Sequence, residues 1–280
     1  MSGLRAERRR ATAIRLILLT AALVAFLLPL AWTALASLGL QANNDTSPPS
    51  FAGPVTLDNF TEVGIAEPTF WQELATSTAS AACAAALAVA ASLLAAYGLV
   101  RSRFPGDRLL TQGFLVIASL PAMAYVIPLS DLMRRAHLVD TFASVVLTET
   151  AVTAPLAIYV LHGALSQLSI EWEEAAWLDG AGLFRAIGQI VLPLVAPSVG
   201  ATAIILFVLD WNLLLVPLVL TAGELKTVPV AMSDFFTFER ELVWPTAAAA
   251  LMISLVPVAI LVAVFHRVLD GFTLNVTRDD

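Results

Sequence analysis

The chain has 280 residues, of which 59% are hydrophobic and 13% are charged, and its mean hydropathy is +0.83. This composition excludes an ordinary soluble domain and predicts a multi-span helical membrane protein. The net charge of −7 says little about nucleic acid in such a chain, and we expect no nucleic-acid partner. The single cysteine, Cys83, excludes a disulfide framework and a thiolate metal site.

Six apolar segments are long enough to cross a bilayer, for which a helix needs about 20 residues. They run over residues 13–38, 74–100, 109–129, 141–165, 194–220 and 244–265. The first could instead be a secretory signal, because Ala34 and Ala36 resemble a cleavage site, but its length favours a retained span. We therefore predict an all-α polytopic membrane protein with six transmembrane helices.

Basic residues between these segments indicate the side of the membrane that each loop faces, because cytoplasmic loops are enriched in Lys and Arg. Arginines cluster in residues 1–12 and in the turn 101–108, whereas the loop 41–70 has no basic residue. The loop 131–140 carries Arg134 and Arg135 and is an exception. We predict a cell-membrane protein with a cytoplasmic N-terminus (residues 1–12) and a cytoplasmic tail (residues 268–280).

The third segment contains Pro121 and Pro128. Each proline breaks a backbone hydrogen bond, which a membrane tolerates only where a neighbour or a cavity satisfies the freed group. A packing kink and a position beside a solute path both fit these prolines.

A polar stretch, residues 169–193, separates the fourth and fifth segments and must lie in water. Ser169 can accept hydrogen bonds from the first turn of a short helix, whose N-terminal end favours the acidic residues that follow. Gly180 can adopt the left-handed conformation that ends this helix. A second helix is expected from about Gly182, with Pro193 as the break before the fifth span. Its apolar face would comprise Leu183, Ile187, Ile190 and Val191.

The first of these short helices offers a surface for another protein. Ala175 and Ala176 leave it low enough for a groove to approach closely, and Glu174 and Asp179 flank it with negative charge. We interpret it as a docking surface. An amphipathic interfacial helix without a partner is the alternative.

The spacing within this stretch resembles a known family motif. Glu-Ala-Ala at residues 174–176, Gly180 after three more residues, and Ile190, Leu192 and Pro193 after a further nine match the EAA loop of permease subunits in binding-protein-dependent ABC importers. The resemblance implies that this loop (residues 166–193) is a coupling helix that sits in a cleft of an ATPase subunit. It also implies a permease domain over residues 13–267, with a core from about residue 70.

Other segments are similar to the carbohydrate-uptake branch of that family, especially to the second permease subunit of maltose-type and glycerol-3-phosphate-type importers. These segments are residues 55–60, the Arg-x-x-Phe-x-Gly turn that begins at Arg101, Trp211-Asn212, and residues 227–230. Two positions depart from the pattern. Leu213 stands where relatives have an acidic residue, and the chain ends in Arg-Asp-Asp instead of a small basic ending.

Two acidic residues, Glu149 and Asp210, lie within apolar segments. A charge at mid-bilayer costs roughly 2.5–3.5 kcal/mol on insertion scales, so such residues usually face a cavity or a partner. Asp210, Trp211 and Asn212 could line the transport path with polar and aromatic groups, and Glu149 is a weaker candidate. A hydrogen bond to a companion subunit is the alternative for Asp210 and Asn212. Glu149 and Asp210 could also lie near the outer interface of the membrane, where the cost of a charge falls away.

No catalytic or metal-binding pattern is present in the sequence. Lys226, the only lysine, follows Leu225, so the chain has no phosphate-binding Gly-x-x-x-x-Gly-Lys-[Ser/Thr] loop. The histidines at 137, 162 and 266 lack ligands at metal spacing. We therefore expect no enzyme activity and no resident cofactor, with ATP and Mg²⁺ bound by another chain.

The resemblance implies a complex of two permease subunits, two ATP-binding cassette ATPase subunits and an extracytoplasmic solute-binding protein, which together import a sugar or sugar derivative. Two other classes remain as alternatives. An ion-coupled secondary transporter would carry inverted repeats, and no second copy of the central pattern is found. A non-transporting assembly subunit of the membrane would need no coupling loop.

Overall fold

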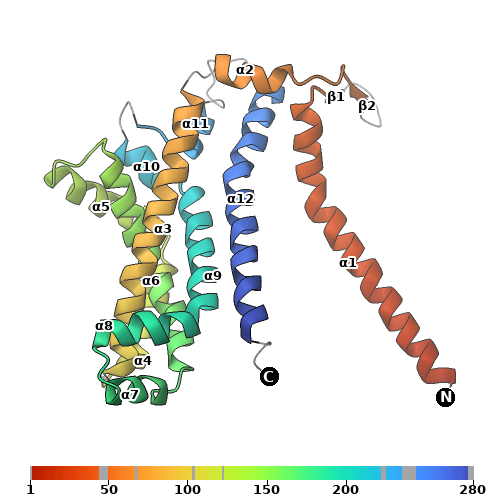
Figure 1. Ribbon diagram of the computed structural model, residues 1–280. Helices are drawn as coiled ribbons and strands as arrows, with labels where there is room; N and C mark the ends of the chain where they lie inside the picture. The colour runs from red at the N-terminus through yellow and green to blue at the C-terminus, as the bar shows by residue number, and fades with distance from the viewer. Residues whose placement is uncertain are drawn as a thin grey trace. The chain divides into compact units, whose positions relative to one another are not determined.

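The computed structural model describes residues 2–43, 50–66, 69–102, 105–121, 123–221, 225–234 and 244–276 (Figure 1). The regular secondary structure of this part of the chain is helical except for one short antiparallel hairpin, in which β1 (Gln41–Asn43) pairs with β2 (Ser50–Ala52). The predicted all-α fold class is confirmed. Residues 103 and 104 of the basic turn and the last four residues of the tail, for which we made predictions, lie outside the described residues.

The helices follow the apolar segments of the sequence. In chain order they are α1 (Ser2–Ser37), α2 (Asp58–Ala66), α3 (Phe70–Arg101), α4 (Asp107–Ala118), α5 (Met123–Arg135), α6 (Phe142–Ser166), α7 (Glu171–Leu178), α8 (Leu183–Ala186), the π-helical turn η1 (Ile187–Val191), α9 (Leu192–Trp211), α10 (Leu215–Leu220), α11 (Val228–Asp234) and α12 (Trp244–Val276). Five stretches of the described chain are long and apolar enough to cross a membrane, and α4 with α5 makes a sixth if the pair is one span.

The chain divides into two compact units. The first comprises residues 1–69 and 235–256, and the second comprises residues 70–234 and 257–280. In the first unit, the Asn59 side chain donates a 3.0 Å hydrogen bond to the Ser37 carbonyl, which ties α2 to the end of α1. The Thr246 hydroxyl donates to Glu62 over 3.1 Å and connects the start of α12 to α2.

The core of the second unit is formed by α3, α6 and α9, which lie side by side (Figure 1). Small buried residues of α3, among them Ala81, Ala85 and Ala88, let the neighbouring helices approach closely. On α9 the rings of Phe207 and Trp211 stack with centroids 5.9 Å apart and complete this core. The long α3 is therefore the helix around which the unit is packed.

The second half of α12 also packs on this core, and it does so at a glycine. A Cβ placed on Gly200 of α9 would lie 1.4 Å from Cζ of Phe265. The phenyl ring therefore occupies the space that any side chain at position 200 would need. Val258 and Leu261 extend the same contact.

The third span is not the single helix that the sequence predicted. α4 and α5 meet at an angle of 91°, and α5 continues through Arg134 and Arg135, which we had placed in a loop. Pro121 lies in the break between α4 and α5, and it lacks the N–H that would continue a helix. The pair is either a broken span or a re-entrant segment.

The fifth span differs at both ends from its predicted range. The helical path is continuous from Leu183 to Trp211, so Pro193 does not break it. The reason is the π-turn η1, in which the Leu192 N–H donates to the Ile187 carbonyl five residues back. This wider turn directly precedes Pro193 and makes room for its ring, which would clash in a regular α-helix. At the other end the helix stops at Trp211, and α10 is separate.

Candidate functional site

α7 forms the first half of the polar loop and begins as the sequence predicted. Ser169 Oγ accepts a hydrogen bond from the Glu171 N–H over 3.3 Å. Three acidic residues, Glu171, Glu173 and Glu174, occupy the first turn, where the helix dipole favours negative charge. Within the second unit, α7 and α8 lie at the end where α4 begins, opposite α10 and α11 (Figure 1).

The end of α7 is a two-bond glycine cap. Gly180 has φ +83°, in the left-handed region. Its N–H donates to the Trp177 carbonyl over 3.0 Å, and the Ala181 N–H donates to the Ala176 carbonyl over 2.9 Å. These are the two bonds of a Schellman motif, which satisfies the last carbonyls of a helix. The prediction that Gly180 closes this helix in the left-handed conformation is confirmed.

Most of α7 is exposed. Glu174, Ala175 and Asp179 face outward, whereas Ala176 is 8% exposed and points into the protein. The predicted alanine surface therefore consists of Ala175 alone. Three large apolar side chains of α7 are also exposed: Trp172, Trp177 and Leu178, the last of which is 89% exposed. Exposed apolar side chains gathered on a short helix are typical of a surface that another protein covers.

The second half of the loop is oriented differently from our prediction. Ile187 and Val191 are buried and Ile190 is partly buried, but Leu183 is half exposed and Phe184 is 81% exposed. Ala186 takes the inward position instead. Leu183 is the first residue of α8, where the chain enters the helix, and it does not continue the buried face of Ile187 and Val191. Leu192 and Pro193 are exposed.

An ion pair that the sequence did not single out anchors α7. Glu173 is 0% exposed, its Oε1 accepts a hydrogen bond from Arg101 Nε over 2.8 Å, and Arg101 Nη2 lies 2.6 Å from the same oxygen in an ion pair. The Tyr97 hydroxyl donates to its Oε2 over 2.6 Å. Removing one partner of such a buried pair costs about 3–5 kcal/mol, because it leaves an uncompensated charge. No local signal separates Glu173 from the acids beside it.

The two acidic residues of the membrane segments are brought together in the second unit. Glu149 of α6 is 1% exposed and Asp210 of α9 is 2% exposed, and the two lie close enough to interact electrostatically. Oε2 of Glu149 and both Asp210 carboxylate oxygens have no hydrogen-bond partner in the described structure. Among the described residues, neither carboxyl group forms an ion pair with a basic side chain.

The other two candidate path residues separate from each other. Trp211 is 7% exposed and belongs to the core around α3, whereas Asn212 is exposed and donates to the Val208 carbonyl over 2.7 Å. The assignment of all four residues to a solute path stays a prediction. Asn212 is the one among them that reaches the surface of this chain.

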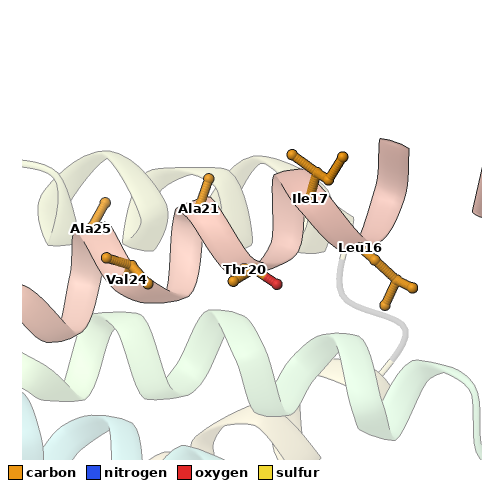
Figure 2. Close-up of a pocket in the computed structure, with 6 residues that line it drawn as sticks. All are labelled: Leu16, Ile17, Thr20, Ala21, Val24 and Ala25. Atoms are coloured by element: carbon orange, nitrogen blue, oxygen red, sulfur yellow. The ribbon is translucent and has the colours of Figure 1, made fainter. Parts of the chain in front are cut away.

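Two further features offer no chemistry of their own. No group of three His, Cys, Asp or Glu side chains in the described ranges is arranged to hold a metal ion. A shallow apolar hollow lies along α1, lined only by residues of that helix (Figure 2). Its lining residues are Leu16, Ile17, Thr20, Ala21, Val24 and Ala25. The side chains that line the hollow carry one hydroxyl group, that of Thr20, and are otherwise hydrocarbon. The hollow therefore suits contact with lipid rather than binding of a polar ligand.

Comparison with known proteins decides the family. A family model described as "Binding-protein-dependent transport system inner membrane component" matches residues 88–273, which is about two thirds of the chain and includes the whole α7 loop. The chain belongs to this family. It is a permease subunit of an ABC importer, a multi-span membrane protein that works in a complex with ATPase and binding-protein partners.

Curated relatives in the family cover most of the chain. The trehalose transport system permease protein SugB of Mycobacterium tuberculosis is 35% identical over 69% of this chain and 71% of its own length. The sulfoquinovosyl glycerol transport system permease protein SmoH of Agrobacterium fabrum is 30% identical over 93% and 92%. The trehalose/maltose transport system permease protein MalG of Thermococcus litoralis is 30% identical over 80% and 82%.

A solved structure supports the fold of the permease. A chain from the crystal structure of a bacterial ABC transporter for import of the acidic polysaccharide alginate superposes with a TM-score of 0.75. The match covers 92% of this chain and 96% of the other, at 17% sequence identity. At that identity the likeness concerns the arrangement of helices alone.

Proposed function

We propose that this permease is one of two subunits that form the translocation pore of an ATP-driven importer for a sugar or sugar derivative. The importer would contain two ATPase subunits, one of which would dock on the α7 loop of this chain, and an extracytoplasmic binding protein would deliver the solute. ATP and Mg²⁺ would be bound by the ATPase subunits. Both termini of this chain would be cytoplasmic, because basic residues cluster at 1–12 and 101–108 and six spans return the chain to the side on which it starts.

The observation that carries the proposal is the exposed helix α7. It is closed by Gly180, and it presents Glu174, Ala175 and Asp179 together with uncovered apolar side chains. A groove in a soluble partner could accept such a helix, as in other helix-in-groove interactions. Ile190, Leu192 and Pro193 would position the start of the fifth span behind it.

The substrate class rests on two kinds of support. Relatives over most of the chain are named for trehalose, for maltose and for sulfoquinovosyl glycerol, which are sugars or sugar derivatives. The sequence also contains the Trp211-Asn212 pair that resembles the carbohydrate branch. We place Asn212 on the solute path, because its side chain is exposed next to an aromatic residue. Asp210 and Glu149 are buried in the helix packing, and they would affect the solute path from there without reaching the surface of this chain.

The experiment is reconstitution of the permease with its companion subunits and binding protein in proteoliposomes. Uptake of radiolabelled trehalose and related sugars should require ATP, and Glu174→Lys or Gly180→Pro should release the ATPase subunits during purification. Asp131→Lys, a charge reversal at an exposed acid of α5, is the matched control and should retain them. Uptake without ATP would instead identify a secondary transporter, and retention of the ATPase in both loop variants would refute the docking role.

A further inference from the structure

α7 has few ways to pass a force to the membrane helices. It is joined to the chain by short non-helical connections, residues 167–170 before it and 179–182 after it. Only two of its side chains are buried, Glu173 and Ala176. Ala176 contributes a single methyl group. Glu173 is therefore the one side chain of α7 that makes a directional contact with another helix of the described structure.

That contact is made with the central helix of the second unit. Tyr97 and Arg101 are four residues apart on α3, so they lie on the same face. Together they occupy both oxygens of the Glu173 carboxylate, at 2.6 Å from Tyr97 and at 2.6 and 2.8 Å from Arg101. Arg101 Nη2 also donates to the Leu168 carbonyl over 3.2 Å, which fixes the connection that precedes α7. We call Tyr97, Arg101 and Glu173 the α3–α7 clasp.

The chemistry of the clasp makes it stiff. Charge-assisted bonds through the planar guanidinium fix direction as well as distance. The Glu173 carboxylate is 0% exposed and the Arg101 side chain is 14% exposed, so salt and water weaken the pair little. An exposed pair such as Arg135 with Asp131 lacks this protection, since its side chains are 77% and 50% exposed and both lie on one helix.

We propose that the α3–α7 clasp makes α7 and α3 move as one body, so that a displacement imposed on α7 reaches the core of the unit through α3. This inference rests on the proposed docking of an ATPase at α7. Tyr97, Arg101 and Glu173 are positioning residues in it, because they hold the docking helix and need not touch the ATPase. Without the clasp, the non-helical connections on both sides of α7 would be the only links through which the displacement could pass.

The test is a distance measurement between the two helices in the assembled transporter. Spin labels are placed on Cys83, which is native and exposed on α3, and on a cysteine introduced by Glu171→Cys, an exposed position of α7. Pulsed electron resonance then gives the distance distribution without nucleotide and with a non-hydrolysable ATP analogue and Mg²⁺. The ATPase subunits must co-purify with the labelled permease, which checks docking independently.

The labelled complex should show a narrow distance distribution that the nucleotide analogue leaves unchanged. Glu173→Gln, and Tyr97→Phe as the variant that removes only one hydroxyl bond, should broaden the distribution and let the analogue shift it, while the ATPase still co-purifies. Asp131→Asn, which removes the exposed pair, should change nothing. A shift in the unsubstituted complex, or unchanged distributions in both clasp variants, would overturn the inference. Loss of the ATPase from the unsubstituted complex would instead refute the docking on which it rests.

Discussion

Replacing Gly180 probes the backbone geometry on which the docking loop depends. At φ +83° an L-residue with a Cβ is disfavoured by about 1–2 kcal/mol. No atom lies within 4 Å of a Cβ built at this position, so Gly180→Ala carries the conformational cost and no steric cost. That cost corresponds to about a 5- to 30-fold smaller population of the Schellman motif that ends α7. Gly180→Asn should lose less, because asparagine tolerates the left-handed region.

Gly180→Pro should be the most damaging of the three substitutions. Proline fixes φ near −65°, and it removes the N–H that donates to the Trp177 carbonyl. The assay is the affinity of purified ATPase subunit for the reconstituted permease, with affinity falling in the order Gly, Asn, Ala, Pro. Gly182→Ala is the matched control, since Gly182 has φ −77° and equally open surroundings. Equal losses at positions 180 and 182, or no loss in Gly180→Ala, would refute the reasoning.

Three further predictions concern the packing and the solute path. Gly200→Ala should lower the stability of the detergent-solubilised complex by about 1–3 kcal/mol through overpacking against Phe265. Adding Phe265→Ala should recover part of this loss, and a double variant no more stable than the single one would contradict the contact. Glu149→Gln and Asp210→Asn should maintain or raise the thermal stability, because each replaces a buried carboxyl group that has an oxygen without a hydrogen-bond partner in the described structure; lower stability in both would disprove this reading. Asn212→Ala, at equal protein level, should alter sugar uptake or selectivity, and unaltered uptake would remove Asn212 from the path.

The sequence predicted those parts of the docking loop that local chemistry determines. Gly180 ends α7 because glycine alone adopts the required conformation without strain, and the acids of the first turn suit a helix N-terminus. The continuity through Pro193 could not be predicted, because a π-turn depends on hydrogen bonds with no sequence pattern of their own. The break in the third span is signalled by Pro121, but its angle of 91° has no signal in the sequence.

Tertiary position, which sequence patterns do not report, explains the remaining differences. Glu171, Glu173 and Glu174 are equivalent in a sequence, yet only Glu173 meets Arg101. Glu149 and Asp210 are 61 residues apart, and only the packing of α6 on α9 places them together. The burial of Trp211 in the core likewise follows from its neighbours on α3, which its own segment does not indicate.

The central claim is that α7 contacts an ATPase subunit on the cytoplasmic side, and site-directed cross-linking tests it most directly. Leu178→Cys is made in a Cys83→Ala background, since Leu178 is 89% exposed at the end of α7. In the assembled transporter a short bifunctional reagent should join this cysteine to the ATPase subunit, and the yield should change when nucleotide is bound. Labelling of the same cysteine by a membrane-impermeant reagent from outside intact cells, or cross-linking to no other chain, would contradict the account.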